Sequence, residues 1–383
     1  ARASLKQAQA ALDKASGSKV PSVSGGLDAS RKRTPGSEDT DSYSFDLSAS
    51  YELDLWGRVD SLVEAERLDF QATQADLETA RISVAGSIAQ TWLDIITTRK
   101  EKEIVKLQLE NNSALLDLIN FRFEHSMANA LDSLQQQETV ASTRAGIPLL
   151  EAKEQVLLNN LALLLGMSSS DKLQINRTDL PKLPPFPALG IPADLLKFRP
   201  DIKSAQFNLI SSDWDVAAAR ANRLPALNLT GGYGYSASEM SLLFDNWFIS
   251  LGASLAATLF DGGTKSAEVR RLEAGVEAEL AAYREAVFQA VMEVENSIIN
   301  EKKQKEYVTL LEEQYTLAKQ TLTEAERQYT NGLQSFIPVI TELPKVHTLE
   351  KRLISEKAKT LKYRIALYRA LGNRWTEQWK EEK

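Results

Sequence analysis

The sequence predicts a mainly α-helical fold with four β-strands, arranged as an internal duplication around long coiled-coil-like helices. Three observations support this prediction. The second half of the chain repeats the pattern of the first with an offset of about 205 residues, two segments alternate apolar with polar side chains, and two segments of roughly 65 residues contain no proline. Each half is therefore expected to run as helix, strand, strand, long helix, turn and return helix.

The internal repeat is clearest in the two long helices. Their apolar residues recur with one spacing, so that Leu77, Val84, Ile88 and Ile95 correspond to Leu280, Val287, Val291 and Ile298. This spacing is that of one helix face, and we interpret these residues as core positions. We assign the first repeat to residues 1–166 and the second to 193–372. A proline-rich connector at 167–192 joins them, and residues 373–383 form a C-terminal tail.

Four segments are predicted to be β-strands. In residues 43–55 and 247–259 nearly every second residue is apolar or aromatic, and most of the residues between are small or polar, which gives each strand two different faces. Residues 20–30 and 225–235 alternate more weakly and are rich in glycine and serine. Strands of about ten residues match the length that spans a bilayer when tilted. Alternation alone is equally consistent with strands at the edge of a soluble β-sandwich.

The length of the helices argues against a sandwich. Residues 57–124 and 263–330 contain no proline and almost no glycine, so each is predicted to form one helix of about 100 Å at about 1.5 Å per residue. Such helices need lateral partners along their whole length, which a compact domain does not provide. We expect these partners to be return helices at 130–165 and 336–371.

Composition excludes several classes of function. The net charge is −7 and basic residues are scattered along the chain, so no nucleic acid partner is expected. There is no cysteine, and the two histidines, His125 and His347, are isolated, which leaves little material for metal binding or acid–base catalysis. We therefore predict no enzyme activity, no cofactor and no metal. Charge runs such as residues 99–103 and 301–305 are interpreted as solvated helix faces.

Three motifs resemble the TolC-type outer-membrane factor family, in its efflux lipoprotein branch. Tyr51–Arg58 resembles the family's strand-to-helix signature, Ile191–Ile202 resembles the start of its second repeat, and Ala141–Gly166 resembles its first return helix. The motifs are ordered and spread over almost the whole chain. The resemblance implies a homotrimer in which each subunit contributes four strands to a twelve-stranded transmembrane β-barrel and its helices to a periplasmic coiled-coil tunnel.

The resemblance also implies a function, that of an outer-membrane channel serving as the passive exit duct of a tripartite efflux or export system. Its partners would be a periplasmic adaptor (membrane fusion) protein, an inner-membrane pump and outer-membrane lipid. The location would be the outer membrane with a periplasmic extension, with a lipid anchor on an N-terminal cysteine that this chain does not contain. The alternative is a periplasmic coiled-coil adaptor or scaffold protein. Two matching pairs of strands favour the channel.

The resemblance places the adaptor-docking residues at the two helix-turn-helix tips, namely Arg122, Phe123, Arg327, Tyr329 and Gly332. The second tip matches the family's Arg-Tyr-x-x-Gly pattern, in which glycine allows the positive φ of a tight turn. The first tip has Phe123 in place of tyrosine and Ser126 in place of glycine. Adaptor docking is therefore expected mainly at the second tip.

The periplasmic gate is assigned, again from the resemblance, to Ile337, Thr341 and Glu342. Ile337 fits the apolar position of the family's constriction. Thr341 stands where relatives commonly have an aspartate, and Glu342 is beside it. Pro344 lies inside the second return helix and removes one of its hydrogen bonds, so a bend near the gate is predicted. The alternative is that Pro338 and Pro344 mark only a local irregularity.

Overall fold

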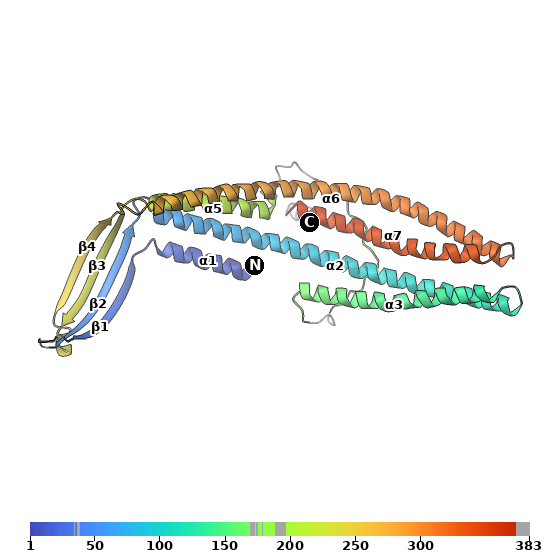
Figure 1. The fold of residues 1–383 in the computed structure, drawn as a ribbon, viewed down its shortest axis with the longest axis horizontal. Coiled ribbons are helices and arrows are strands. Elements are labelled where there is room, and N and C mark those ends of the chain that lie inside the picture. Colours follow the sequence, from blue (N-terminus) through green and yellow to red (C-terminus); the bar gives the residue numbers. More distant parts are fainter. Residues whose placement is uncertain are drawn as a thin grey trace, which may run out of the picture. The chain divides into compact units, whose positions relative to one another are not determined.

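The computed structural model describes residues 1–33, 35–36, 39–168, 173, 175–177, 179–187 and 197–372, and within them one order of elements occurs twice (Figure 1). The first series is α1 (Arg2–Gly17), β1 (Ser22–Lys32), β2 (Thr40–Leu53), α2 (Arg58–Glu124) and α3 (Ala130–Leu164). The second is α5 (Pro200–Ala221), β3 (Ala226–Ala237), the short 3-10 helix η2 (Met240–Leu242), β4 (Trp247–Ala256), α6 (Thr264–Thr330) and α7 (Ile337–Ala370). Residues 188–196, where the connector was predicted to end and the second repeat to begin, and the predicted tail at 373–383 lie outside the described residues.

The two long helices were predicted correctly. α2 and α6 contain 67 residues each, and neither includes a proline. The one glycine near the middle of α2, Gly86, has a packing reason, because a Cβ added there would overlap the side chain of Arg369 on α7. Of the apolar stripe predicted to be core, Leu77 and Ile95 are buried, whereas Val84 is 44% exposed. Among the described residues, part of this stripe is therefore left uncovered.

The chain divides into two compact units, each of which takes residues from both halves of the sequence. The first unit comprises 1–80 and 200–288, and it contains the sheet, α1, α5 and the first parts of α2 and α6. The second unit comprises 81–199 and 289–383, and it contains α3, α7 and the remainder of the long helices. In the described part of the chain, no helix is both long and apolar enough to cross a membrane.

The four strands form one antiparallel sheet in the order β1-β2-β3-β4. The strands lie where the alternation placed them, although β2 and β4 end a few residues earlier than predicted. β2 and β3, which belong to different halves of the chain, pair along their length, with Tyr51 opposite Leu229 and Phe45 opposite Tyr235. The duplication therefore gives a single sheet with β1 and β4 as its edges.

In the second unit, the return helices pack along the long helices as predicted (Figure 1). Lys102 on α2 pairs with Glu154 on α3 at 2.5 Å. Lys357 on α7 pairs with Glu312 on α6 at 2.6 Å. The prolines inside the return helices, Pro148 and Pro344, do not end them. The bend expected near Pro344 stays a prediction.

One charged residue contradicts the interpretation of residues 301–305 as a solvated face. Glu301 is 1% exposed and receives two hydrogen bonds from Arg364 on α7, at 2.7 and 2.6 Å. Burial alone raises the pKa of Glu301, but hydrogen bonds from Arg364 and Lys305 outweigh it, so that the pKa lies below its ordinary value. The prediction failed because the sequence does not show which charged residue of a helix faces a partner helix, and here the partner residue is 63 positions away.

The same arginine holds the connector. Arg364 Nη1 donates to the carbonyl oxygens of Pro184 and Pro185, each at 2.6 Å, and its guanidinium lies 5.0 Å from the ring centroid of Phe186. Proline leaves its carbonyl available but offers no N–H to a sheet or helix, so such a segment depends on external donors. Arg99 on α2 performs a similar task by donating to the carbonyl of Ile175. Two arginines thus attach an irregular segment to the helical bundle.

Replacement of Glu301 by glutamine should lower the free energy of unfolding by about 3 kcal/mol, because Arg364 would keep a buried charge without a counter-charge. The matched control is Glu306→Gln on the same helix, which removes an exposed pair with Lys303 and should cost less than about 1 kcal/mol. Chemical unfolding of the detergent-solubilised protein measures both values. Equal effects of the two substitutions would contradict this account.

The same carboxylate makes stability depend on pH. Because the pKa of Glu301 is lowered on folding, its contribution to the free energy of unfolding is present at neutral pH. This contribution is lost as the pH falls below about 4.3, the ordinary pKa of glutamate, and through the lowered pKa of the folded state.

Candidate functional site: a two-faced sheet and two helical tips

The register of the sheet places all odd-numbered strand residues on one face. Across the four strands, Val23 lies opposite Ala49, Ala49 opposite Gly231, and Gly231 opposite Leu251. Directly opposed residues of an antiparallel pair point to the same side. The large apolar and aromatic side chains of this odd face are Val23, Leu27, Tyr43, Phe45, Leu47, Tyr51, Leu53, Leu227, Leu229, Tyr233, Tyr235, Trp247, Ile249, Leu251 and Leu255. The face also holds an ion pair, Arg31 with Asp41, at the far end of β1 and β2.

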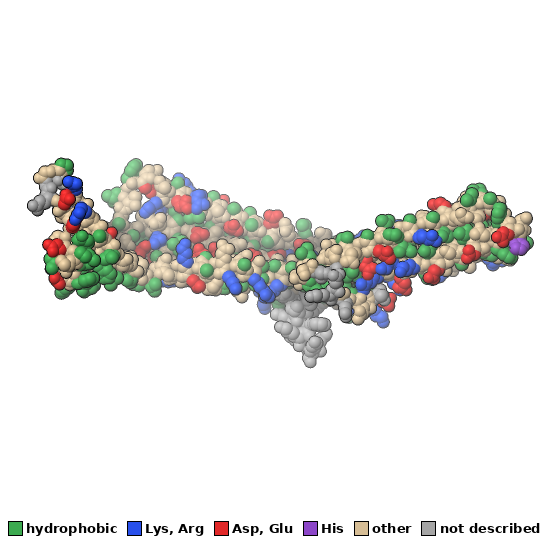
Figure 2. Space-filling model, turned by 90° about the horizontal axis from the view of Figure 1, so that it is seen from below, with side chains coloured by type: hydrophobic (Ala, Val, Ile, Leu, Met, Phe, Trp, Pro, Cys, Tyr) green, Lys and Arg blue, Asp and Glu red, His purple; other side chains and the backbone are tan. Residues whose placement is uncertain are grey.

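The apolar face is open to its surroundings. Leu251 is 87% exposed, Val23 72% and Leu27 70%, and every residue of β4 is exposed. Figure 2 shows hydrophobic side chains gathered over the sheet. A contiguous apolar surface of this kind marks contact with a partner or a membrane rather than with water.

The even face of the sheet is small and polar. Ser22 and Ser24 on β1 share hydrogen bonds with Ser50 and Ser48 on β2, each at 2.8 Å. The exception is Phe248, whose ring lies over Gly234, where an added Cβ would be only 2.9 Å from it. The two faces therefore suit two different solvents, one apolar and one aqueous.

Two elbows connect the sheet to the long helices. At the first, Gly57 adopts φ +73° before α2, and Trp56 donates from Nε1 to the carbonyl of Pro225 at 2.8 Å. At the second, Asp261 caps α6 by accepting hydrogen bonds from the backbone N–H groups of Gly263 and Lys265, at 2.8 and 3.0 Å. Before this cap, Leu259 and Phe260 are more than 90% exposed. Apolar and aromatic side chains therefore also mark the helical end of the sheet.

The two tips end their long helices in the same way. At the first tip, Met127 N–H donates to Arg122 O at 2.7 Å and Ser126 N–H to Phe123 O at 3.0 Å. At the second tip, the corresponding bonds join Leu333 to Gln328 and Gly332 to Tyr329, at 2.9 and 3.0 Å. This pair of bonds is the Schellman motif, which needs a left-handed residue at the turn. The sequence signal for it, glycine, is missing from the first tip.

Ser126 takes the left-handed conformation without being a glycine. Its φ is +60°, against +71° for Gly332, and it is the one non-glycine residue with positive φ among those described. A left-handed conformation costs an L-residue roughly 1–2 kcal/mol. The first tip thus has the fold of the second, and its departure from the family pattern changes the strain rather than the shape.

The structure brings Arg122 and Tyr329, which belong to different tips, into contact. The Arg122 guanidinium lies 4.7 Å from the ring centroid of Tyr329, and its Nη1 donates to Thr330 O at 2.9 Å. Tyr329 is only 4% exposed and packs 5.1 Å from Phe336 within an apolar cluster that includes Ile119. These two predicted docking residues therefore hold the tips together. The sequence offers no signal for this pairing.

The other predicted tip residues lie at the surface. Phe123 is 47% exposed, and Gly332 is exposed at its turn. Arg327 points to Glu324 and donates to it at 2.6 and 2.8 Å. Hydrogen bonds from Arg327 and Gln328 lower the pKa of Glu324 to about 2. The second tip thus carries an exposed ion pair beside its turn.

The predicted gate residues lie at the beginning of α7. Ile337 is the first residue of the helix and is 67% exposed. Thr341 is one turn later on the same face and donates from Oγ1 to Ile337 O at 2.8 Å, while Glu342 pairs with Lys345 at 2.7 Å. The opposite face of this turn is buried through Val339. Ile337 and Thr341 therefore lie on the exposed face of this turn, and the Thr341 hydroxyl is engaged in a hydrogen bond to its own helix.

Comparison with known proteins identifies the class. Residues 1–167 and 191–373 match the family model described as outer membrane efflux protein. The chain belongs to this family, and its fold, predicted from the resemblance, is confirmed. It is an outer-membrane channel protein of efflux systems.

Two relatives illustrate the similarity. The chain is 32% identical over 390 residues to the pyoverdine export outer membrane protein OpmQ of Pseudomonas putida, an alignment that covers 98% of this chain and 82% of that protein. It is 29% identical over 374 residues to the outer membrane protein OprJ of Pseudomonas aeruginosa, with 94% and 77% covered.

Solved structures agree with the sequence relatives. A membrane protein from Pseudomonas aeruginosa superposes with a TM-score of 0.90 at 27% identity, over 96% of this chain and 88% of that chain. The outer-membrane channel OprN superposes with a TM-score of 0.88 at 26% identity, over 97% and 86%.

Exchange of the turn residues tests the strain at the tips. Ser126→Gly should raise the free energy of unfolding by about 1 kcal/mol, because glycine removes the cost of positive φ. Gly332→Ala should lower it by a similar amount for the opposite reason, since an added Cβ meets nothing within 4 Å and only the backbone conformation is penalised. Thermal unfolding of the two variants beside the parent protein measures these shifts. Shifts of the same sign would show that the turn conformation is not what the substitutions change.

Proposed function

We propose that three copies of this chain assemble into one outer-membrane exit duct. The observation that carries the proposal is the two-faced sheet. Its odd face is apolar and exposed, and its edges, β1 and β4, have no further strand beside them among the described residues. Open edges of this kind carry unpaired backbone N–H and C=O groups, which pair readily with a strand of another chain. Three sheets of four strands give twelve strands, which close the edges, turn the apolar face to lipid and leave the serine-rich face around water.

The helices extend the duct into the periplasm in this proposal. The tips dock a periplasmic adaptor protein, and an inner-membrane pump provides the energy, so the chain itself carries out no catalysis. Support comes from the resemblance of the second tip to the family pattern and from the identical Schellman turns of the two tips. The assigned docking surface is the exposed set Phe123, Arg327 and Gly332, while Arg122 and Tyr329 fix the position of one tip against the other.

The gate is proposed to lie at Ile337. Its side chain projects from the first turn of α7, where three symmetry-related copies would face one another around the axis of the duct. Thr341 and Glu342 do not build an acidic ring in this scheme, since threonine carries no charge and Glu342 forms an ion pair with Lys345. An apolar constriction then closes the duct by excluding water.

The cargo is proposed to be small organic molecules. Among the relatives, one pair is named for pyoverdine export and others for toluene or solvent efflux. The alternative of a periplasmic adaptor or scaffold is disfavoured, because the family match covers both halves of the chain. A lipid anchor on a preceding cysteine belongs to the same proposal and rests on the resemblance to the lipoprotein branch.

The orientation of the sheet is tested with lysine substitutions on β4. Leu251→Lys places a charge on the apolar face and should destabilise the membrane-inserted protein by about 2–4 kcal/mol. Ser254→Lys, three residues further along the same strand, lies on the polar face and should cost less than about 1 kcal/mol. Reversible unfolding from lipid vesicles measures both. A larger loss for the serine variant would reverse the assignment of the faces.

The gate is tested by single-channel recording. Ile337→Gly should raise the closed-state conductance several-fold, because it removes three apolar side chains from the constriction at a helix start that tolerates glycine. Thr341→Asp serves as the control, since it adds charge without opening space and should shift selectivity toward cations with little gain in conductance. Unchanged conductance of the glycine variant would place the constriction elsewhere, and a water-soluble monomer without conductance would remove the channel proposal.

A further inference from the structure

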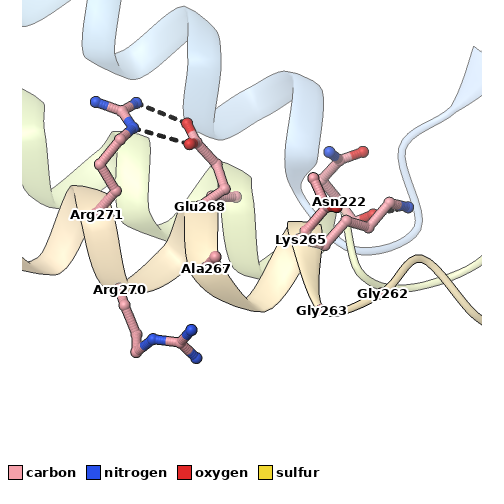
Figure 3. A pocket seen from close by; sticks show the side chains of 10 residues that line it. Asn222, Gly262, Gly263, Lys265, Ala267, Glu268, Arg270 and Arg271 are labelled. Carbon is pink, nitrogen blue, oxygen red and sulfur yellow. Dashed lines mark hydrogen bonds and ion pairs between the residues drawn. The ribbon is translucent and has the colours of Figure 1, made fainter.

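A cavity of about 830 Å³ lies at the second elbow, where the sheet meets α6. Its walls come from the end of α5 at Asn222, the glycines Gly262 and Gly263, and the first two turns of α6 (Figure 3). Gly263, Ala267 and Arg270 follow one another at i, i+4 and i+7, which is one face of the helix. The small residues leave a floor along this face, and Arg270 stands at its far end, about 10 Å from Gly263 along the axis.

The charges of this cavity are mostly positive. Lys265, Arg270 and Arg271 line it together with one carboxylate, that of Glu268. Arg271 donates to Glu268 at 2.8 and 2.6 Å, and Lys265 Nζ donates to the carbonyl of Asn222 at 2.6 Å. In the described part of the chain no carboxylate pairs with Arg270, and Figure 3 shows its side chain turned away from the Arg271–Glu268 pair. One guanidinium therefore stays available to an anion.

The N–H groups at the start of α6 are not what would bind that anion. Asp261 already accepts hydrogen bonds from Gly263 and Lys265, so the helix end is capped by the protein's own carboxylate. An anion in this cavity would have to be held by the side-chain cations. The first elbow gives a contrast within the same chain, because its arginine, Arg58, donates from Nε and Nη2 to the carboxylate of Glu52, at 2.8 and 2.5 Å.

The cavity also lies next to the apolar end of the sheet. Leu259 and Phe260, which are 96% and 91% exposed, immediately precede the turn that forms its wall. Exposed apolar and aromatic residues come first here, and an unpaired cation, Arg270, follows two turns into the helix. This matches the order of hydrocarbon and phosphate at a membrane surface. This step rests on the proposed contact of the apolar sheet face with lipid.

We propose that this cavity binds the headgroup of an anionic phospholipid at the periplasmic surface of the outer membrane. Arg270 holds the phosphodiester, the floor formed by Gly263 and Ala267 accommodates the glycerol region, and the acyl chains extend along Leu259 and Phe260. The second elbow of each subunit is then a lipid site, whereas the first elbow, with its internal Arg58–Glu52 pair, is not.

The experiment is native mass spectrometry of the full chain, purified in detergent and exposed to equal amounts of phosphatidylglycerol and phosphatidylcholine. The parent protein should retain phosphatidylglycerol preferentially. Arg270→Gln should lower its retention about fivefold, which is the effect of one cation near an anionic surface. Glu268→Gln should raise the retention, because it frees the guanidinium of Arg271. The matched control is Arg284→Gln, an exposed arginine on the same helix about 21 Å further along.

Each outcome decides between the proposals. Equal retention by the Arg270 and Arg284 variants would overturn the lipid site, and so would displacement of the lipid by an equal concentration of soluble glycerol phosphate, which would indicate a phosphate site instead. Conductance in bilayers is measured on the same samples. If the parent protein inserts and conducts but has no preference for phosphatidylglycerol, only the lipid site fails. If it does not insert, the proposed channel fails with it.

Discussion

A four-stranded sheet with one apolar face and two open edges is the constraint on which the remaining features depend. Water does not favour the apolar odd face, and the part of the chain that the structure describes has no strand to add beyond β1 or β4. The serine-rich even face is equally unsuited to lipid. Closure with further copies between lipid and water satisfies the apolar face, the polar face and both edges together. The glycines of β3 help, since a Cβ at Gly234 would lie 2.7 Å from the backbone oxygen of Phe45 and 2.9 Å from the Phe248 ring.

The helices meet a different requirement, because a helix of 67 residues is stable only if its apolar stripe is covered. Within one chain, α3 and α7 cover part of it, and Val84 is an example of a residue left exposed. Polar contacts then fix the register of the helices. The buried Glu301–Arg364 pair locks α7 against α6, and the same arginine attaches Pro184 and Pro185 to the bundle. A connector without regular hydrogen bonds is thus fixed by one side chain.

The tips combine rigidity with exposure. Identical Schellman turns end the two hairpins, and the contact of Arg122 with Tyr329 and Thr330 joins them. Residues that a family pattern groups together therefore have different tasks, since Tyr329 is buried while Phe123 and Arg327 are exposed. A partner that docks at this end would meet a preformed surface, which lowers the entropy cost of binding.

The sequence by itself determined the duplication, the four strands and the two long helices, because each is written in local periodicity or in the absence of proline. It also located the tips, since Gly332 marks one turn and the repeat marks the other. Only the tertiary structure decided that Glu301 is buried while Glu306 is exposed, that Tyr329 packs against Arg122, and that Ser126 adopts a left-handed turn. The first two outcomes depend on contacts between side chains at least 63 residues apart in the sequence, and the third depends on a turn imposed by two packed helices. No local sequence pattern encodes such long-range contacts.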